Sequence, residues 1–240
     1  MLFNIEKCKI MHLGHNNRDH TYHMSNINLE TVTEERDLGV LQSNDLKSGK
    51  HCADVVKAAN RTLGMIRRSF EYKSITVVSH LYKALVRSKL EYAIQAWCPH
   101  LQKDKDLLEG VQRRATKIVP ALRDLPYEDR LKAFGLTTLT ERRTRGDMIE
   151  TYKILTHREN VNPTTFFEVP PNIGTRGHRL KIFKKRSRLD VRKFFYSQRV
   201  VEGWNSLPKT VIESTSVNCF KSRYDRHRGA ALLPLRPETV

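Results

Sequence analysis

Apolar residues recur at helical spacing over the middle of the chain, and they predict three amphipathic helices. The first is predicted over residues 48–70, with an apolar stripe of Cys52, Val55, Val56, Ala59, Leu63, Ile66 and Phe70. The second is predicted over residues 75–92, with an inward stripe of Val77, Val78, Leu81, Tyr82, Leu85, Val86 and Leu90. The third is predicted over residues 104–119, with Asp104 as its N-cap and a stripe of Leu107, Leu108, Val111, Ala115, Ile118 and Val119.

Shorter helices are predicted beyond Pro120, which ends the third helix because proline cannot continue one. They cover residues 126–134, 139–157 and 216–227. A further helix is predicted over residues 191–206, with inward Phe194, Phe195, Val200, Val201 and Trp204. Residues 158–178 contain three prolines and two glycines, and this composition indicates a linker.

The first 41 residues show a different pattern, which is typical of short strands and turns. Residues 7–13 can form a strand that runs into Gly14, and Asn16-Asn17 breaks it. Residues 37–41 predict a third strand at the end of this region. A strand at residues 7–13 needs a neighbour to pair with, which raises the question of what lies upstream of it.

The chain is therefore expected to be mainly α, or α+β overall. We expect a short β-hairpin region, a helical bundle and a small basic α+β domain at the C-terminus. The predicted boundaries are 1–47 for the strands, 48–157 for the bundle and following helices, 158–178 for the linker, 179–228 for the basic domain and 229–240 for a loose tail.

The charge of the chain points to a polyanionic partner. It holds 43 Lys and Arg against 26 Asp and Glu, a net charge of +17, and residues 176–228 alone hold 15 basic residues against 4 acidic ones. Such a balance favours RNA or DNA. No apolar run approaches the ~20 residues of a membrane span, and no secretory signal is present. The four cysteines are scattered, which fits an intracellular protein of the nucleus or cytoplasm.

Two groups of basic residues are candidates for contact with nucleic acid. The first lies on the outer faces of the predicted helices and comprises Lys57, Arg61, Arg67, Arg68, Lys83, Arg87, Arg113 and Lys117. The second has aromatic residues interleaved and comprises Arg176, Arg179, Lys181, Lys184, Lys185, Arg186, Arg188, Arg192 and Lys193. Arginine binds phosphate through two hydrogen bonds, and aromatic rings stack on bases. The alternatives are a solvated helix face, and a nuclear-import signal at residues 184–186.

Two other clusters have weaker functional readings. His12, His15, His20 and His23 follow Cys8 and could hold zinc, but their spacing differs from that of familiar zinc fingers, so we favour a solvated polar hairpin. We therefore predict no metal and no cofactor. Arg142, Arg143 and Arg145 lie near a predicted helix start, where positive charge opposes the helix dipole. Their partner could be Glu141, Asp147 or a phosphate.

The order of five segments over residues 3–228 resembles one known family. The segments are FNIEKCKIMHLG, DLGV, LVRSKLEYAIQAWCPHLQKDKDLLEGVQRRATK, LRDLPYEDRLKAFGLTTLTERRTRGDMIETYKIL and RSRLDVRKFFYSQRVVEGWNSLP. In this order and spacing they resemble the C-terminal part of the reverse transcriptases of LINE-type (non-LTR) retrotransposons of the Jockey-like kind.

The resemblance implies roles for several segments. Lys7 takes the place of a lysine near the incoming nucleotide at the end of the palm. Leu38, Gly39 and Val40 match the primer grip, a hairpin that holds the primer's 3′ end. Residues 48–120 match the helical thumb, which lies along the template–primer duplex, and the remainder matches the basic region that follows.

The resemblance also implies what the chain lacks. In the family an Asp-Asp pair in the palm helps to hold two metal ions for nucleotidyl transfer, and this chain contains no Asp-Asp pair. We therefore expect a truncated C-terminal fragment of an RNA-directed DNA polymerase that binds RNA, DNA or their hybrid, has no catalytic residues and takes no small-molecule substrate. The alternatives are a host-recruited module that binds a protein through the surface where the palm would pack, or a non-functional remnant of a retroelement.

Overall fold

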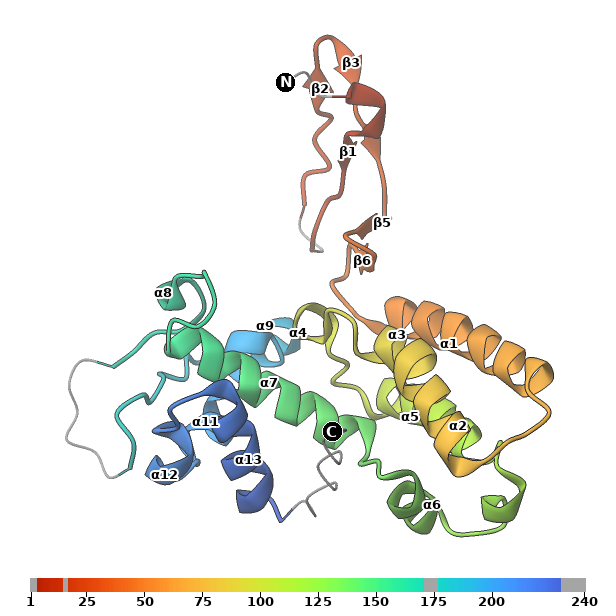
Figure 1. Ribbon diagram of the computed structural model, residues 1–240. Helices are drawn as coiled ribbons and strands as arrows, with labels where there is room; N and C mark the ends of the chain where they lie inside the picture. The colour runs from red at the N-terminus through yellow and green to blue at the C-terminus, as the bar shows by residue number, and fades with distance from the viewer. Residues whose placement is uncertain (1–3, 15–16, 171–176, 230–240) are drawn as a thin grey trace. The chain divides into compact units, whose positions relative to one another are not determined.

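A computed structural model describes residues 4–14, 17–170 and 177–229 of the chain (Figure 1). The fold is mainly α, with a few short strands near the N-terminus, as the hydrophobic pattern predicts. Contacts between Cα atoms divide the chain into two compact units, Met1–Pro120 and Ala121–Val240. Each unit is described by itself below.

The N-terminal strands of the first unit are shorter than the sequence predicts. They are β1 (Lys9–Ile10), β2 (His23–Met24), β3 (Ile27–Asn28), β4 (Glu30–Thr31), β5 (Glu34–Asp37) and β6 (Val40–Ser43). Strand β1 pairs in parallel with β4, whereas β2–β3 and β5–β6 are antiparallel hairpins. Lys7 lies in a short 3-10 helix, η1 (Ile5–Lys7), and not in the predicted strand.

The segment predicted as a third strand, residues 37–41, is instead a tight hairpin turn. Asp37 pairs with Val40, so Leu38 and Gly39 alone form the connection between β5 and β6. Both have positive φ, 45° for Leu38 and 83° for Gly39, which is the backbone of a type I′ turn. The hairpin expected from the resemblance at Leu38-Gly39-Val40 is therefore present.

Helices form the rest of the first unit. They are α1 (Gly49–Ser69), α2 (Ile75–Leu81), the π-helix η2 (Tyr82–Arg87), α3 (Ser88–Glu91), α4 (Ile94–Trp97) and α5 (Gln102–Thr116). The short 3-10 helix η3 (Pro120–Leu122) follows. Their core contains Ala59, Tyr82, Val86, Leu90 and Leu108, all buried. The three predicted helices are thus found, and the second is continued through η2 and α3.

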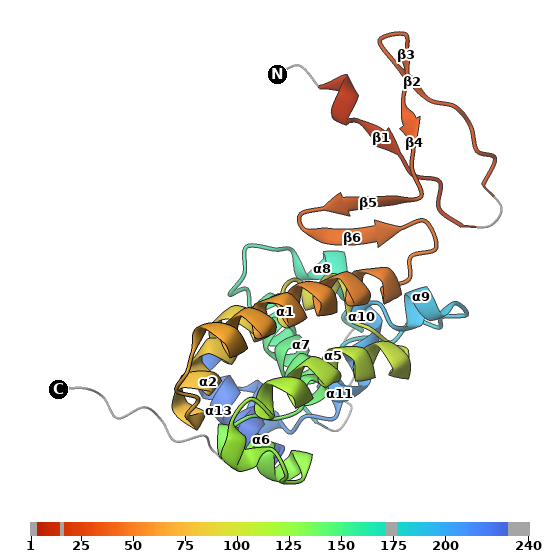
Figure 2. The same cartoon turned by 90° about the vertical axis from the view of Figure 1, so that its right-hand side faces the viewer.

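Helices α1 and α5 lie side by side and run in the same direction (Figure 2). A Cβ atom at Gly49 would lie 3.6 Å from a carboxylate oxygen of Asp104, which places the two N-termini together. Nearer the other end, Nε of Arg114 donates to Oδ1 of Asn60 at 3.1 Å. The C-terminal halves of the two helices are therefore neighbours.

In the helices of this unit, one predicted N-cap and three predicted inward-facing residues were wrong. Asp104 is not an N-cap, because it is buried within the first turn of α5 and Leu101 occupies the cap position. Phe70, Leu85 and Leu107 were predicted to face inward, but their exposed fractions are 40, 41 and 46%. The apolar stripe of each helix is narrower than the spacing suggests, because only part of each helix surface meets a neighbour.

The second unit is built around helix α7 (Leu139–Leu155). Its other helices are α6 (Tyr127–Phe134), α8 (Pro163–Phe166), α9 (Asp190–Lys193), α10 (Tyr196–Arg199), α11 (Val201–Asn205), α12 (Lys209–Ile212) and α13 (Val217–His227). Thr138 caps α7 through a capping box with Glu141. Tyr152 of α7 stacks on Phe220 of α13 with ring centroids 4.4 Å apart, and both rings are fully buried with Trp204.

Because of this core, the boundary between the two units differs from the predicted domain boundaries. Helix α7 packs against α11 and α13, so residues 139–155 share one core with residues 196–224. The division of the chain falls after Pro120 and not at residues 158–178. Part of that predicted linker is ordered, because α8 lies in it and Phe167 and His178 are buried.

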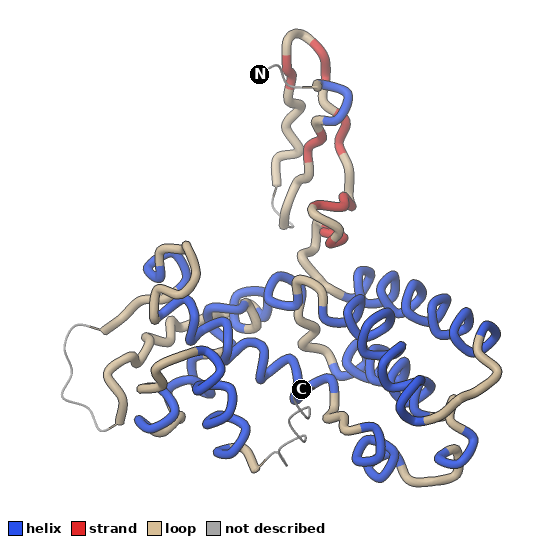
Figure 3. Tube along the Cα trace, viewed as in Figure 1, coloured by secondary structure: helices blue, strands red, loops and turns tan. Residues whose placement is uncertain are grey.

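Three further expectations for the second unit differ from the structure. The single helix predicted over 191–206 is three short helices, and Phe195 is 42% exposed instead of buried. Among residues 121–170 and 177–229 no strand is present, so the α+β character expected for the C-terminal domain is not found (Figure 3).

The predicted tail lies outside the described residues except for Gly229. Within the described ranges, no helix is both long and apolar enough to cross a membrane.

Candidate nucleic-acid interface

Residues 55–69 of α1 and residues 110–119 at the end of α5 carry positive charge without any acidic residue. Residues 55–69 and 110–119 together contain seven basic residues and no Asp or Glu. All seven are exposed, and we call them the helical basic set: Lys57, Arg61, Arg67, Arg68, Arg113, Arg114 and Lys117. Because α1 and α5 are parallel neighbours, Arg67 and Arg68 lie at the same end of the helix pair as residues 113–117, whereas Lys57 and Arg61 lie nearer the middle of α1.

Few members of the helical basic set are neutralised by the protein. Among the residues that the structure describes, Lys57, Arg61, Arg67, Arg68 and Lys117 make no ion pair with a carboxylate. Part of the charge has a structural reason, since basic residues are favourable at helix C-termini, where the dipole is negative. That reason applies within the last turn of a helix, so it accounts for Arg67 and Arg68 but not for Lys57 and Arg61.

The structure removes some predicted residues from this surface. Arg87 has a side chain only 18% exposed, and its Nε lies 3.8 Å from Oε2 of Glu91. Lys83 is half-buried. Both were predicted to face outward and both lie on helix faces that turn partly into the bundle.

Lys7 is exposed at the end of η1. Arg114, a member of the set, was not among the predicted residues, although the absence of acids around it was a usable signal.

Hairpin β5–β6 is held against α1 and the segment after α3. Guanidinium nitrogens of Arg36 donate to the carbonyl of Gly39 at 3.0 Å and to Oδ2 of Asp54 at 2.8 Å. The hydroxyl of Tyr92 donates to the carbonyl of Leu38 at 3.1 Å. The side chain of Leu38 is 83% exposed at the turn. The hairpin thus presents an apolar residue to solvent from a rigidly held turn.

In the second unit, residues 178–183 form an extended segment bound to α11. The side-chain amide of Asn205 makes two hydrogen bonds to the backbone of Ile182, at 3.0 and 2.8 Å. Nε1 of Trp204 donates to the carbonyl of Leu180 at 2.6 Å. His178 and Ile182 are buried, whereas Arg179 points outward. Residues 178–183 of the predicted basic stretch are therefore anchored to α11 by hydrogen bonds to their backbone and by the buried side chains of His178 and Ile182.

Several predicted basic residues in this stretch are paired with acids. Lys184 pairs with Glu202, and this contact lowers the pKa of the Glu202 carboxyl. Lys185 lies 2.8 Å from Glu168, and Arg179 lies 3.8 Å from Glu213. These residues are exposed, and such surface pairs exchange readily with other anions. Lys181 is half-buried, and Arg176 lies outside the described residues.

The following residues form a basic loop that we define as residues 186–193. Its exposed cations are Arg186, Arg188, Arg192 and Lys193. The guanidinium of Arg192 lies 5.6 Å from the ring centre of Phe195, and the ammonium of Lys193 lies 5.3 Å from that of Phe194. Leu189 is 73% exposed among them. Cations and exposed apolar side chains therefore alternate along this loop.

The arginines near the start of α7 serve the interior of the second unit. Arg145 makes a bidentate pair with Asp225 of α13, at 2.6 and 2.8 Å. Asp147, which was one suggested partner, pairs instead with Arg199 at 2.8 and 3.0 Å. Burial raises the pKa of Asp147, and the charges of Arg199 and Arg143 oppose that shift. Because Arg143 is itself buried and Arg145 is paired with Asp225, these two arginines are structural and do not belong to the interface.

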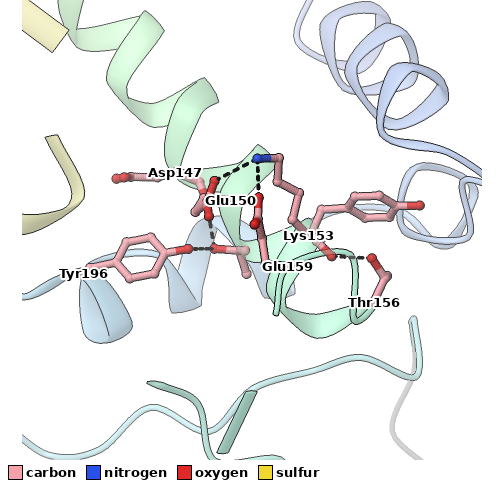
Figure 4. Close-up of polar contacts among 8 residues, drawn as sticks. Asp147, Glu150, Lys153, Thr156, Glu159 and Tyr196 are labelled. Carbon is pink, nitrogen blue, oxygen red and sulfur yellow. Dashed lines mark hydrogen bonds and ion pairs between the residues drawn. The ribbon is translucent and has the colours of Figure 1, made fainter. Parts of the chain in front are cut away.

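A polar network extends this cluster along α7 (Figure 4). The hydroxyl of Thr151 lies 3.0 Å from that of Tyr196 and donates to the carbonyl of Asp147 at 2.8 Å. Burial raises the pKa of Tyr196 well above its usual value. Two residues beyond Thr151, Lys153 pairs with Glu159 at 2.6 Å. The network fixes α7 against α10 and the following loop.

The histidine cluster has no metal-site geometry among the residues described. No group of three His, Cys, Asp or Glu side chains converges within them. Nδ1 of His12 lies 3.1 Å from Oδ1 of Asn17, and His20 contacts the ring of Tyr22 edge-on. His15 lies outside the described residues.

Comparisons of the chain with family models, curated proteins and solved structures found no match to any of them.

Proposed function

We propose that this protein binds nucleic acid, and that it corresponds to the thumb and C-terminal region of a LINE-type reverse transcriptase. The observation that carries the proposal is the helical basic set. It places seven cations along two parallel helices, within segments that contain no carboxylate. Such a surface suits the closely spaced phosphates of a duplex or hybrid, because each neutralised phosphate releases bound counterions.

Two other features support this proposal. Hairpin β5–β6 presents the exposed Leu38 from a turn that Arg36 and Tyr92 hold in place, as a primer-grip hairpin would. The basic loop adds cations and apolar side chains that suit unpaired nucleotides. The chain contains no Asp-Asp pair, so the activity that we assign to these residues is binding and not polymerisation.

The proposal is tested by titrating the purified protein with an RNA–DNA hybrid, duplex DNA and single-stranded RNA. Anisotropy is measured at several salt concentrations between roughly 50 and 200 mM. If about six phosphates are neutralised, the logarithm of the binding constant on duplex DNA falls with the logarithm of salt at a slope of about −5. We expect tight binding with a slope of this order.

Two triple variants locate the surface. The first, Lys57→Ala/Arg61→Ala/Arg68→Ala, removes three cations from the helical basic set. It should make the slope less steep by about 3, so that it rises from about −5 to about −2. The second removes the same charge elsewhere through the exposed Lys47, Lys89 and Lys132, each changed to Ala, and should leave the slope nearly unchanged. Folded protein that binds none of the three probes at low salt would refute the proposal.

A further inference from the structure

The second unit contains a pocket that is lined in part by Arg192 of the basic loop. The pocket contains no residue of the helical basic set. It has a volume of about 350 Å³ and is lined by residues 164–169 of α8 and the segment after it, together with Phe183, Lys185, Arg192 and Gln198. This volume lies at the small end of the range for ligand pockets in proteins. Phe183 is 50% exposed at the rim, whereas Gln198 is 5% exposed and lies deep. The pocket therefore has an aromatic, basic rim and an amide in its interior.

Gln198 is the unusual residue of this pocket. Its Oε1 is fully buried yet has no hydrogen-bond partner among the described residues. Its backbone N–H is satisfied by the carbonyl of Phe195 at 2.9 Å, so the unsatisfied atom is the side-chain oxygen. Leaving a buried amide unpaired costs free energy, typically about 1–3 kcal/mol. An unpaired acceptor in a pocket wall is a candidate contact for a ligand or a water molecule.

The amide of glutamine offers an acceptor and donors side by side. The Watson–Crick edge of every nucleobase offers the complementary arrangement, a donor next to an acceptor, and it is accessible only when the base is unpaired. Phe183 at the rim can stack on the face of such a base, and Lys185 and Arg192 lie where its phosphate would need cations.

We propose that this pocket binds one unpaired nucleobase of a single-stranded nucleic acid. The base edge hydrogen-bonds to Gln198, the ring of Phe183 stacks on the base, and the neighbouring phosphate pairs with Lys185 and Arg192. This inference rests on the proposed function and deepens it, because it assigns single-stranded segments to the second unit.

Charge distinguishes this occupant from a peptide. Residues 177–193 carry eight basic residues and one acid, so a ligand with regularly spaced negative charge is favoured at the rim. Glu168 also lines the pocket and lies 2.8 Å from Lys185. Because this pair is exposed, a phosphate can take the place of the Glu168 carboxylate while that carboxylate turns to solvent.

The test compares a 12-nucleotide single-stranded RNA with a blunt duplex of the same sequence, measured by anisotropy at one salt concentration. Phe183→Ala should weaken binding of the single strand by roughly five-fold to one hundred-fold, the usual effect of losing one base stack, and leave duplex binding unchanged. Tyr22→Ala is the control, because Tyr22 is 49% exposed, as Phe183 is 50% exposed, but belongs to the first unit and does not line the pocket. It should leave single-strand affinity within about two-fold.

Gln198→Leu provides a second, independent readout. It removes the unsatisfied amide while keeping the volume, so the melting temperature should stay the same or rise. Single-strand affinity should nevertheless fall several-fold. A lowered melting temperature with unchanged affinity would show that Gln198 has a structural role and would overturn the inference.

The failures of the two proposals are distinguishable. If the wild-type protein binds RNA with a steep salt dependence, but Phe183→Ala and Tyr22→Ala both bind the single strand as well as the wild type does, the pocket assignment is wrong and the proposed function stands. If the wild-type protein binds neither RNA at low salt, and neither the hybrid nor duplex DNA, both are wrong. If Phe183→Ala lowers single-strand and duplex affinity alike, the pocket does not select unpaired bases, and the inference is likewise refuted.

Discussion

Nδ1 of His51 accepts a hydrogen bond from the backbone N–H of Leu41 at 3.1 Å, and this contact joins helix α1 to hairpin β5–β6. The imidazole is 2% exposed and lies edge-on to Trp97, with ring centres 4.6 Å apart. Only a nitrogen without a proton can accept this bond. Burial, with the nearby charge of Arg36, lowers the pKa of His51 below its usual value of 6.5.

The first prediction is that the first unit loses stability in mild acid. Because the pKa of His51 is lower in the folded state, the unfolded state binds more protons between that pKa and 6.5. The contribution of His51 is therefore complete above pH 6.5 and decreases as the pH falls through this window. The free energy of unfolding is measured by urea titration between pH 7.5 and 5.

Trp97 is a suitable probe because the chain has only two tryptophans. In a Trp204→Phe background the fluorescence comes from Trp97 alone. His51→Gln keeps an acceptor but cannot titrate, so its stability should depend less on pH. His80→Gln, at an exposed position of α2, should keep the wild-type dependence. Equal pH slopes for wild type and His51→Gln would contradict the assignment.

The second prediction concerns the strained turn of the hairpin. Leu38 has a φ of 45°, in the left-handed region that costs an ordinary residue roughly 1–2 kcal/mol. Asparagine tolerates this conformation and is preferred before glycine in type I′ turns. Leu38→Asn should therefore raise the free energy of unfolding by about 1 kcal/mol, measured by urea titration.

Leu38→Ala separates strain from the exposed side chain. Alanine keeps the β-carbon, so it should gain little stability, yet it removes the apolar side chain as completely as asparagine does. If the turn contacts a primer end, both variants should bind a recessed RNA–DNA hybrid more weakly than the wild-type protein does. Gly39→Ala should be destabilising, because φ is 83° there. Equal stability of the alanine and asparagine variants at position 38 would show that the turn carries no strain.

The third prediction is that Arg199 is required mainly to compensate Asp147. Arg199→Met leaves a buried carboxylate without its bidentate partner and should cost about 3–5 kcal/mol at pH 7. Burial already raises the pKa of Asp147 above 3.8, and loss of Arg199 raises it further. The folded state then takes up a proton as the pH falls, so the defect of the variant should shrink in acid.

Asp147→Asn provides the rescue for this pair. In the Arg199→Met background, the neutral amide should recover most of the lost free energy of unfolding, because the buried carboxylate that lacks its bidentate partner is removed. The four proteins of this double-mutant cycle are compared by urea titration monitored at Trp204 in a Trp97→Phe background. Additive effects of the two substitutions would refute the coupling.

The fourth prediction concerns the segment held by Asn205. Asn205→Asp keeps an acceptor for the N–H of Ile182 but loses the donor to its carbonyl. It also places two carbonyl-type oxygens against each other, so residues 179–186 should detach more often. Trypsin should cleave this lysine- and arginine-rich segment several-fold faster than in the wild-type protein.

Mass spectrometry of timed digests identifies the cleavage sites. Ser206→Ala is the control, because the Ser206 hydroxyl donates only to the carbonyl of Gly203 in the neighbouring turn. Its cleavage pattern should match that of the wild-type protein. Unchanged cleavage of Asn205→Asp within residues 179–186 would mean that the buried Ile182 holds the segment without the amide.

The sequence by itself determined the helices and the charge. Long periodic stretches such as 48–70 and 139–157 became α1 and α7 with bounds shifted by only one or two residues, since amphipathic periodicity reflects burial directly. The density of lysine and arginine in residues 55–69 and 176–193 is likewise a property of the chain alone. The helices and the charge density can therefore be predicted without knowing which helices pack against each other.

Tertiary structure decided which faces and charges remain available. Phe195 has the spacing of a core residue but is exposed, because the chain turns between α9 and α10. Arg145 and Arg199 resemble the other arginines in sequence, yet Asp225 and Asp147 pair with them across the fold. Helix α7 joins the C-terminal core although a proline-rich segment separates them. The partners of Arg145, of Arg199 and of helix α7 are distant in sequence, and local spacing carries no information about them.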